Sequence, residues 1–108
     1  MSTKFYVKRD NILAAMRLAA NVVNKSSTLA VLANVGIVIY NGKMSLRATN
    51  LGAFLDVQVG VRMADNAEPN GRITVPARTL LDMLTVLPDD EIEVEIVELT
   101  ANLHLRTP

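Results

Sequence analysis

The residues best suited to chemistry are three carboxylates, Glu91, Glu93 and Glu95, which occupy every second position of one segment. Apolar residues fill the positions between them, an alternation that is typical of a β-strand. On a strand the three carboxylates point the same way at intervals of about 7 Å, which is too open for a tight metal cage. Since no further ligand accompanies them, we predict a solvated acidic face of a sheet and no metal site.

Catalytic side chains are otherwise scarce. The only histidine, His104, has no serine, aspartate or cysteine partner placed for nucleophilic work, so we interpret it as an exposed strand residue. The absence of cysteine excludes thiol catalysis, a disulfide framework and a cysteine-ligated metal. The glycines form no phosphate-cradling pattern. The sequence therefore predicts a binding or scaffolding protein without a cofactor, and not an enzyme.

The length of 108 residues suits one domain, spanning 1–108. Its core must be aliphatic, because 50% of the residues are hydrophobic and only 4% are aromatic. The N-terminal residues lack the apolar stretch of a signal peptide, and no run approaches the roughly 18 apolar residues that a membrane span needs. We therefore expect a cytoplasmic location.

Charge is divided unevenly along the chain. Residues 1–50 carry seven basic side chains and one acidic one, whereas residues 51–108 carry four basic and ten acidic side chains. Such a split indicates either two electrostatically different surfaces or ordinary scattered surface charge. The choice between these two interpretations depends on which helices and strands carry the charged residues.

The first half predicts the order strand, helix, strand, strand, strand. Residues 4–8 form the first strand, and Asp10 is predicted to cap the helix that follows. The helix places Arg17 on the side opposite its apolar residues, which are Ile12, Leu13, Met16, Ala19, Ala20 and Val23.

The next three strands are predicted at residues 35–40, 43–49 and 55–63. The first two are joined by Asn41-Gly42, the strongest short hairpin signal, because both residues tolerate the positive φ of a type I′ turn.

The second half repeats the order strand, helix, strand, strand. After a strand at residues 72–75, Pro76 is predicted as the first residue of a helix that exposes Arg78. Strands at 91–96 and 99–106 follow. The buried face of this helix is predicted to comprise Leu80, Leu81, Leu84 and Leu87.

A shift of 68 residues aligns the start of both halves, so we predict two half-repeats, 1–68 and 69–108, of which the second lacks its last strand. The predicted fold class is α+β, with both helices packed on one face of an antiparallel sheet. Arg17, Lys25 and Arg78 belong to the helices or their ends. Long cations beside small polar side chains suit sequence-independent contact with phosphate, although a solvated helix face is the alternative.

Four stretches of the chain, in order and spacing, resemble the first domain of the bacterial sliding clamp, the β subunit of DNA polymerase III. The most specific is Ile-Thr-Val-Pro-Ala-Arg, which leads into a helix that ends at Leu-Pro. The four stretches are residues 4–7, 28–34, 46–51 and 73–88.

The resemblance implies a DNA-clamp fold of βαβββ half-repeats, with one more strand than this sequence contains. It further implies a homodimeric ring of three such domains per chain, in which helices surround duplex DNA and sheets form the outer wall. Arg17, Lys25 and Arg78 would then face DNA, and the replicative polymerase, the clamp loader and a second subunit would be partners. The alternative is a stand-alone half-clamp interaction module that forms no ring and pairs through an open sheet edge.

Overall fold

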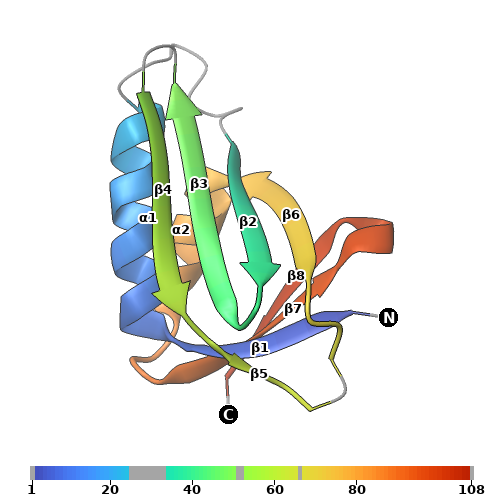
Figure 1. Cartoon of the computed structure of the whole chain (residues 1–108). Coiled ribbons are helices and arrows are strands. Elements are labelled where there is room, and N and C mark those ends of the chain that lie inside the picture. The colour runs from blue at the N-terminus through green and yellow to red at the C-terminus, as the bar shows by residue number, and fades with distance from the viewer. Residues whose placement is uncertain (1, 25–33, 51–52, 66, 108) are drawn as a thin grey trace.

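The computed structural model describes residues 2–24, 34–50, 53–65 and 67–107 (Figure 1). The two helices are α1 (Arg9–Asn24) and α2 (Ala77–Val86), and a short 3-10 turn, η2 (Glu98–Thr100), lies near the end of the chain. The strands are β1 (Thr3–Lys8), β2 (Asn34–Tyr40), β3 (Lys43–Asn50), β4 (Ala53–Gly60), β5 (Arg62–Met63), β6 (Gly71–Pro76), β7 (Glu91–Val97) and β8 (Asn102–Arg106).

The strands form two antiparallel sheets that exchange their first strands. Sheet 1 has the order β5-β1-β7-β8, and sheet 2 has the order β4-β3-β2-β6. Strand β1 therefore pairs with β7 from the second half of the chain, while β6 pairs with β2 from the first half. The predicted order of elements in the two half-repeats is confirmed, except that two strands, β4 and β5, replace the last strand of the first half. The division between residues 68 and 69 stays a prediction.

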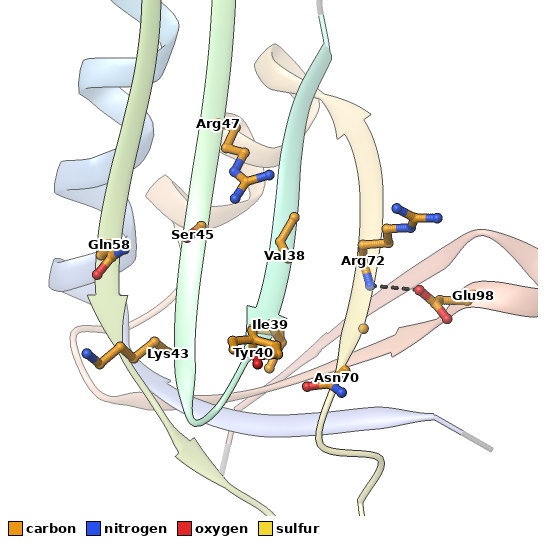
Figure 2. Close-up of a pocket in the computed structure, with 11 residues that line it drawn as sticks. Val38, Ile39, Tyr40, Lys43, Ser45, Arg47, Gln58, Asn70, Arg72 and Glu98 are labelled. Atoms are coloured by element: carbon orange, nitrogen blue, oxygen red, sulfur yellow. Dashed lines mark hydrogen bonds between the residues drawn. The ribbon is translucent and has the colours of Figure 1, made fainter.

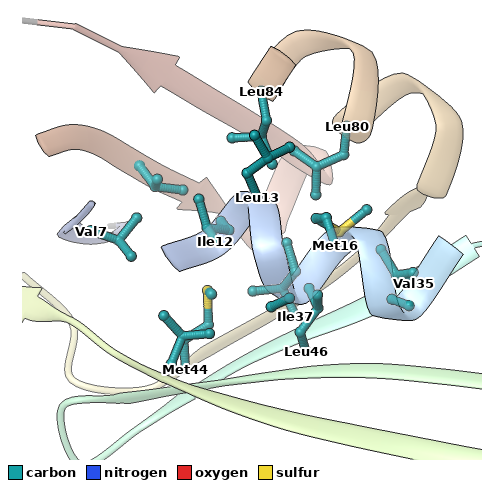
Figure 3. Packing of buried hydrophobic residues seen from close by; sticks show 14 of the residues in the cluster. Val7, Ile12, Leu13, Met16, Val35, Ile37, Met44, Leu46, Leu80 and Leu84 are labelled. Carbon is teal, nitrogen blue, oxygen red and sulfur yellow. The ribbon is translucent and has the colours of Figure 1, made fainter. Parts of the chain in front are cut away.

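Both helices pack on the same side of the sheets, as predicted (Figure 1). We call this side the inner side, and the opposite side the outer face. Helix α1 contacts β3, β4 and α2, and apolar side chains from both halves of the chain meet between the layers (Figure 3). The core is aliphatic apart from Phe5, which is fully buried. Of the predicted helix residues, Ile12, Leu13, Met16, Ala19, Ala20, Leu80 and Leu84 are buried, Leu81 and Leu87 are half-buried, and the side chain of Val23 lies outside the described residues.

The predicted hairpin turn is confirmed. Asn41 and Gly42 join β2 to β3 with φ values of 53° and 74°, both in the left-handed region. Tyr40 and Lys43 face each other across the turn. The type I′ geometry keeps the two strands in register with their right-handed twist.

Both predicted helix starts are displaced. Helix α1 begins at Arg9, so Asp10 lies inside the first turn, where its negative charge still favours the helix dipole. Pro76 is the last residue of β6 and the N-cap of α2, with an extended ψ of 127°, instead of the first helical residue. The fixed φ of proline is compatible with either position, so the residue type alone did not decide between them.

The run predicted as one strand at residues 55–63 changes sheet. Strand β4 ends at Gly60 in sheet 2, and β5 begins at Arg62 in sheet 1, where it pairs with β1. The prediction of one continuous strand was therefore wrong. Periodicity did not reveal the corner, because apolar alternation continues unchanged through it.

The prediction for the segment before β8 was also wrong at its start, because β8 begins only at Asn102. Glu98–Thr100 form the turn η2, and Ala101 follows with a left-handed φ of 54°. Leu99, predicted as the first residue of this strand, is 95% exposed. Strand β8 lies at the edge of sheet 1, as the sequence predicted.

Strand β6 starts where it passes very close to β1. The Thr3 hydroxyl, which is buried, donates a hydrogen bond of 3.0 Å to the carbonyl of Asn70. A Cβ atom at Gly71 would lie 2.8 Å from the Cβ atom of Thr3. Only glycine therefore allows the two first strands to meet at this point.

We predict that Gly71→Ala lowers the free energy of unfolding by about 1–3 kcal/mol, because the added methyl group overpacks a buried contact. The matched control is Gly60→Ala, where an added Cβ meets no atom within 4 Å. That variant should be neutral or slightly stabilising. Urea denaturation of both variants checks the prediction, which fails if the two substitutions change stability equally.

Candidate nucleic-acid interface

The structure places Arg17 and Arg78 on the two helices with exposed side chains, as predicted. In α1 the buried residues Ile12, Leu13 and Met16 face the sheets, which turns Arg17 outward. In α2 the buried residues Leu80 and Leu84 have the same effect on Arg78. The third predicted cation, Lys25, lies outside the described residues.

The exposed side of the helices is close to neutral. Helices α1 and α2 carry three arginines and two aspartates. Arg9 is only 17% exposed and lies 3.3 Å from Asp10, so it adds little to the surface charge. Among the described residues, no carboxylate lies within ion-pair distance of Arg17 or Arg78. These two guanidinium groups are therefore available to an anion.

The chemistry of this side suits phosphate better than bases. Neither helix contains an aromatic residue that could stack on a base. Leu18 and Met83 are exposed to 53% and 41%, and the small residue Ala14 is also exposed. Arginines on such a surface can contact backbone phosphates without reading sequence.

The outer face of sheet 1 is not the acidic surface that the sequence predicted. Strand β1 lies beside the acidic strand β7, and its register places Lys4 opposite Glu95 and Lys8 opposite Glu91. Residues directly opposite in an antiparallel pair share a face, so a lysine lies beside each of these two carboxylates, while Glu93 lies opposite Tyr6. Part of the charge difference between the two halves of the sequence is thus balanced across this pair of strands.

Arginines from the two edge strands of sheet 1, β5 and β8, balance the remaining negative charge of the three glutamates. Arg106 on β8 donates hydrogen bonds of 2.8 Å and 3.2 Å to Glu93 and Glu95. Arg62 on β5 lies 2.7 Å from Glu91 and stacks 4.2 Å from the ring centroid of Tyr6. Four basic side chains therefore accompany the three glutamates, and the prediction of an acidic face was wrong.

Two glutamates have lowered pKa values. The hydrogen bond from Arg106 is the main reason why the pKa of Glu93 lies below its ordinary value of 4.5. For Glu95 the main cause is the hydrogen bond from the hydroxyl of Ser2, and Arg106 comes second. In both cases the donor stabilises the charged form of the carboxyl group.

The remaining sequence predictions concern the single histidine, a metal site and a membrane span. His104 is exposed on β8 opposite Glu95, as predicted. Within the described residues, no group of three histidine, cysteine, aspartate or glutamate side chains is arranged to hold a metal ion. In that same part of the chain, no helix is long and apolar enough to cross a membrane.

Sequence reasoning did not identify a second group of cations. Lys43 and Arg47 on β3, together with Arg72 on β6, line a groove on the outer face of sheet 2 (Figure 2). The signal was present in the sequence, because Lys43, Ser45 and Arg47 alternate with buried residues and must share one face. Their proximity to Arg72 depends on the exchange of strand β6, which periodicity does not show.

The fold of two exchanged half-repeats, with helices on one side and sheets on the other, is that of a DNA clamp domain. Residues 3–107 match the family described as DNA polymerase III beta subunit, N-terminal domain. The chain therefore belongs to this family.

Named relatives agree with this assignment. The beta sliding clamp of Pseudomonas putida is 41% identical over 96 residues, which cover 87% of this chain and 25% of that protein. The beta sliding clamp of Pseudomonas aeruginosa is 44% identical over 87 residues, covering 80% of this chain and 23% of that protein. The chain thus spans about a quarter of the length of these relatives.

Solved structures show the same fold. The sliding clamp from Pseudomonas aeruginosa bound to griselimycin aligns with a TM-score of 0.78 at 35% identity, covering 100% of this chain and 28% of that one. The polymerase beta subunit of Streptococcus pyogenes aligns with a TM-score of 0.80 at 16% identity, covering 97% and 28% of the two chains. The second likeness shows the fold alone.

We predict that Arg106→Gln raises the pKa of Glu93 more than that of Glu95, because Glu95 keeps its hydrogen bond from Ser2. The lowered pKa values stabilise the folded chain above the ordinary value of 4.5, and this contribution is lost as the pH falls through the folded values. The variant should therefore lose less stability on acidification. Carboxyl NMR titration checks the two shifts.

The control for this titration is Arg72→Gln, which removes the same charge from sheet 2. It should leave the pKa values of both glutamates unchanged. The explanation is wrong if the two variants shift Glu93 alike, or if Arg106→Gln shifts neither carboxyl group.

Proposed function

We propose that this chain is part of a DNA sliding clamp, which encircles duplex DNA and tethers the replicative polymerase for processive synthesis. The main support is the family match over residues 3–107 together with 44% identity to a beta sliding clamp. In this proposal the chain has no catalytic role. Its partners are duplex DNA, the polymerase, the clamp loader and a second clamp subunit, and its location is the cytoplasm.

The proposed contact with DNA is made by Arg17, Arg78 and Lys25 through backbone phosphates. Two exposed arginines on otherwise nearly neutral helices support a weak contact of this kind. Weak contacts with phosphate leave no preferred sequence, so the protein can move along the duplex. Retention on DNA then comes from closure of the ring and not from the affinity of one domain.

The alternative function is a stand-alone half-clamp module that binds another protein without forming a ring. The observation that favours it is the position of β8 at the edge of sheet 1, where unpaired backbone groups can accept a further strand. Such a module would need no contact between its helices and DNA. The DNA-binding experiment below therefore separates the two functions.

We predict that the chain binds duplex DNA weakly and without sequence preference. With three phosphate contacts, the slope of log affinity against log salt concentration should be about −3. Arg17→Gln combined with Arg78→Gln should reduce the magnitude of this slope by about 2, because each phosphate contact contributes about one unit. Fluorescence anisotropy with two unrelated duplexes at several salt concentrations measures these values.

The matched control combines Lys4→Gln with Lys8→Gln, which removes the same net charge from the outer face of sheet 1. This variant should keep the slope of the unmodified chain. The proposed interface is ruled out by equal losses in the two double variants, or by a strong preference for one duplex.

A further inference from the structure

A groove crosses the outer face of sheet 2, on the side that faces away from α1 (Figure 2). It consists of two adjoining hollows of about 510 Å³ and 450 Å³, which share Val38, Arg47, Arg72 and Glu98. Strands β2, β3 and β6 form its floor, and η2 forms one wall. The groove thus depends on the same strand exchange that builds the sheets.

The charges of this groove differ from those on sheet 1. Among the described residues, no carboxylate lies within ion-pair distance of Lys43 or Arg72. Arg47 has a partner in Asp56 at 3.3 Å, but its side chain is still 47% exposed. The lining contains three cations and one carboxylate, so an acidic ligand gains contacts that sheet 1 cannot offer.

The one carboxylate in the lining is already engaged. Glu98 accepts a hydrogen bond of 2.8 Å from the backbone amide of Arg72 at the free edge of β6 (Figure 2). This hydrogen bond connects η2 to β6 and offsets part of the negative charge of the Glu98 carboxylate. The hydrogen bond therefore joins this wall of the groove to β6, beside the cations.

Two residues of β2 add apolar surface to the groove. Val38 is half-buried on β2, and Tyr40, on the same face of that strand, is 63% exposed. An apolar side chain that rested on these two residues would remove exposed apolar surface from water. The cations Lys43, Arg47 and Arg72 are also among the residues that line the groove.

We propose that this groove binds an extended acidic peptide segment of a partner protein, with an apolar side chain between its carboxylates. The polar residues Ser45, Gln58 and Glu98 offer both donors and acceptors, which suits a peptide backbone with its own N–H and C=O groups. A nucleic-acid strand would bring phosphates, which only accept, and would find a single aromatic residue on which to stack. The site goes beyond the proposed contact with DNA and lies on the opposite face.

The test is an NMR titration of the 108-residue chain with the capped peptide EDDLDDE. Binding should shift the amides of β2, β3 and β6 and should weaken as salt is added. Lys43→Gln combined with Arg72→Gln should weaken the affinity about fivefold, since each exposed ion pair contributes modestly. Lys4→Gln with Lys8→Gln, the same change of charge on sheet 1, should have no effect.

Two further ligands make the result decisive. The peptide EDDSDDE, which lacks the leucine, should bind more weakly because it cannot use Val38 and Tyr40. A single-stranded octamer of thymidine should bind less tightly than the leucine peptide. The proposal is overturned if no shifts occur, if the groove variant binds as well as the control, or if the oligonucleotide binds more tightly at the same amides. Duplex-DNA binding is measured separately, so failure here leaves the proposed clamp function standing.

Discussion

The fold depends on the exchange of first strands between its two halves. Strand β1 completes the sheet of β7 and β8, while β6 completes the sheet of β2, β3 and β4. Each sheet therefore contains strands from both halves, and α1 packs against β3 and β4 of its own half and against α2 of the other half. Close packing at the exchange point requires Gly71 beside Thr3, where a larger residue would collide. The two halves form one core with residues from both, in which Phe5 and Ile92 are fully buried.

The exchange also explains the distribution of charge. A sequence whose first half is basic and second half acidic gives no acidic outer sheet, because the basic strand β1 pairs with the acidic strand β7. Among the described residues, cations that have no carboxylate within ion-pair distance include Arg17 and Arg78 on the helices and Lys43 and Arg72 on sheet 2. The two proposed contacts with anions therefore lie on separate surfaces, one on each side of the domain.

Much of the fold could be predicted from the sequence, because local patterns encode it. Helical spacing identified both helices and their buried leucines, and Asn41-Gly42 located the hairpin. Patterns of this kind do not report partners distant in sequence. The neutralisation of Glu93, the change of sheet after Gly60 and the groove beside Arg72 all depend on which strands are neighbours. The exposed position of Arg17 followed from periodicity, whereas its proposed contact with DNA rests on the resemblance to the family.

The most direct test of this account is native-state hydrogen exchange on the whole chain. If the exchanged strands make the two halves one cooperative unit, the most protected amides of β1, β2, β6 and β7 will share one free energy of opening and one dependence on denaturant. Those amides should then exchange only through global unfolding. The account is contradicted if amides of β2 and β3 stay protected under conditions in which β7 and β8 have already opened.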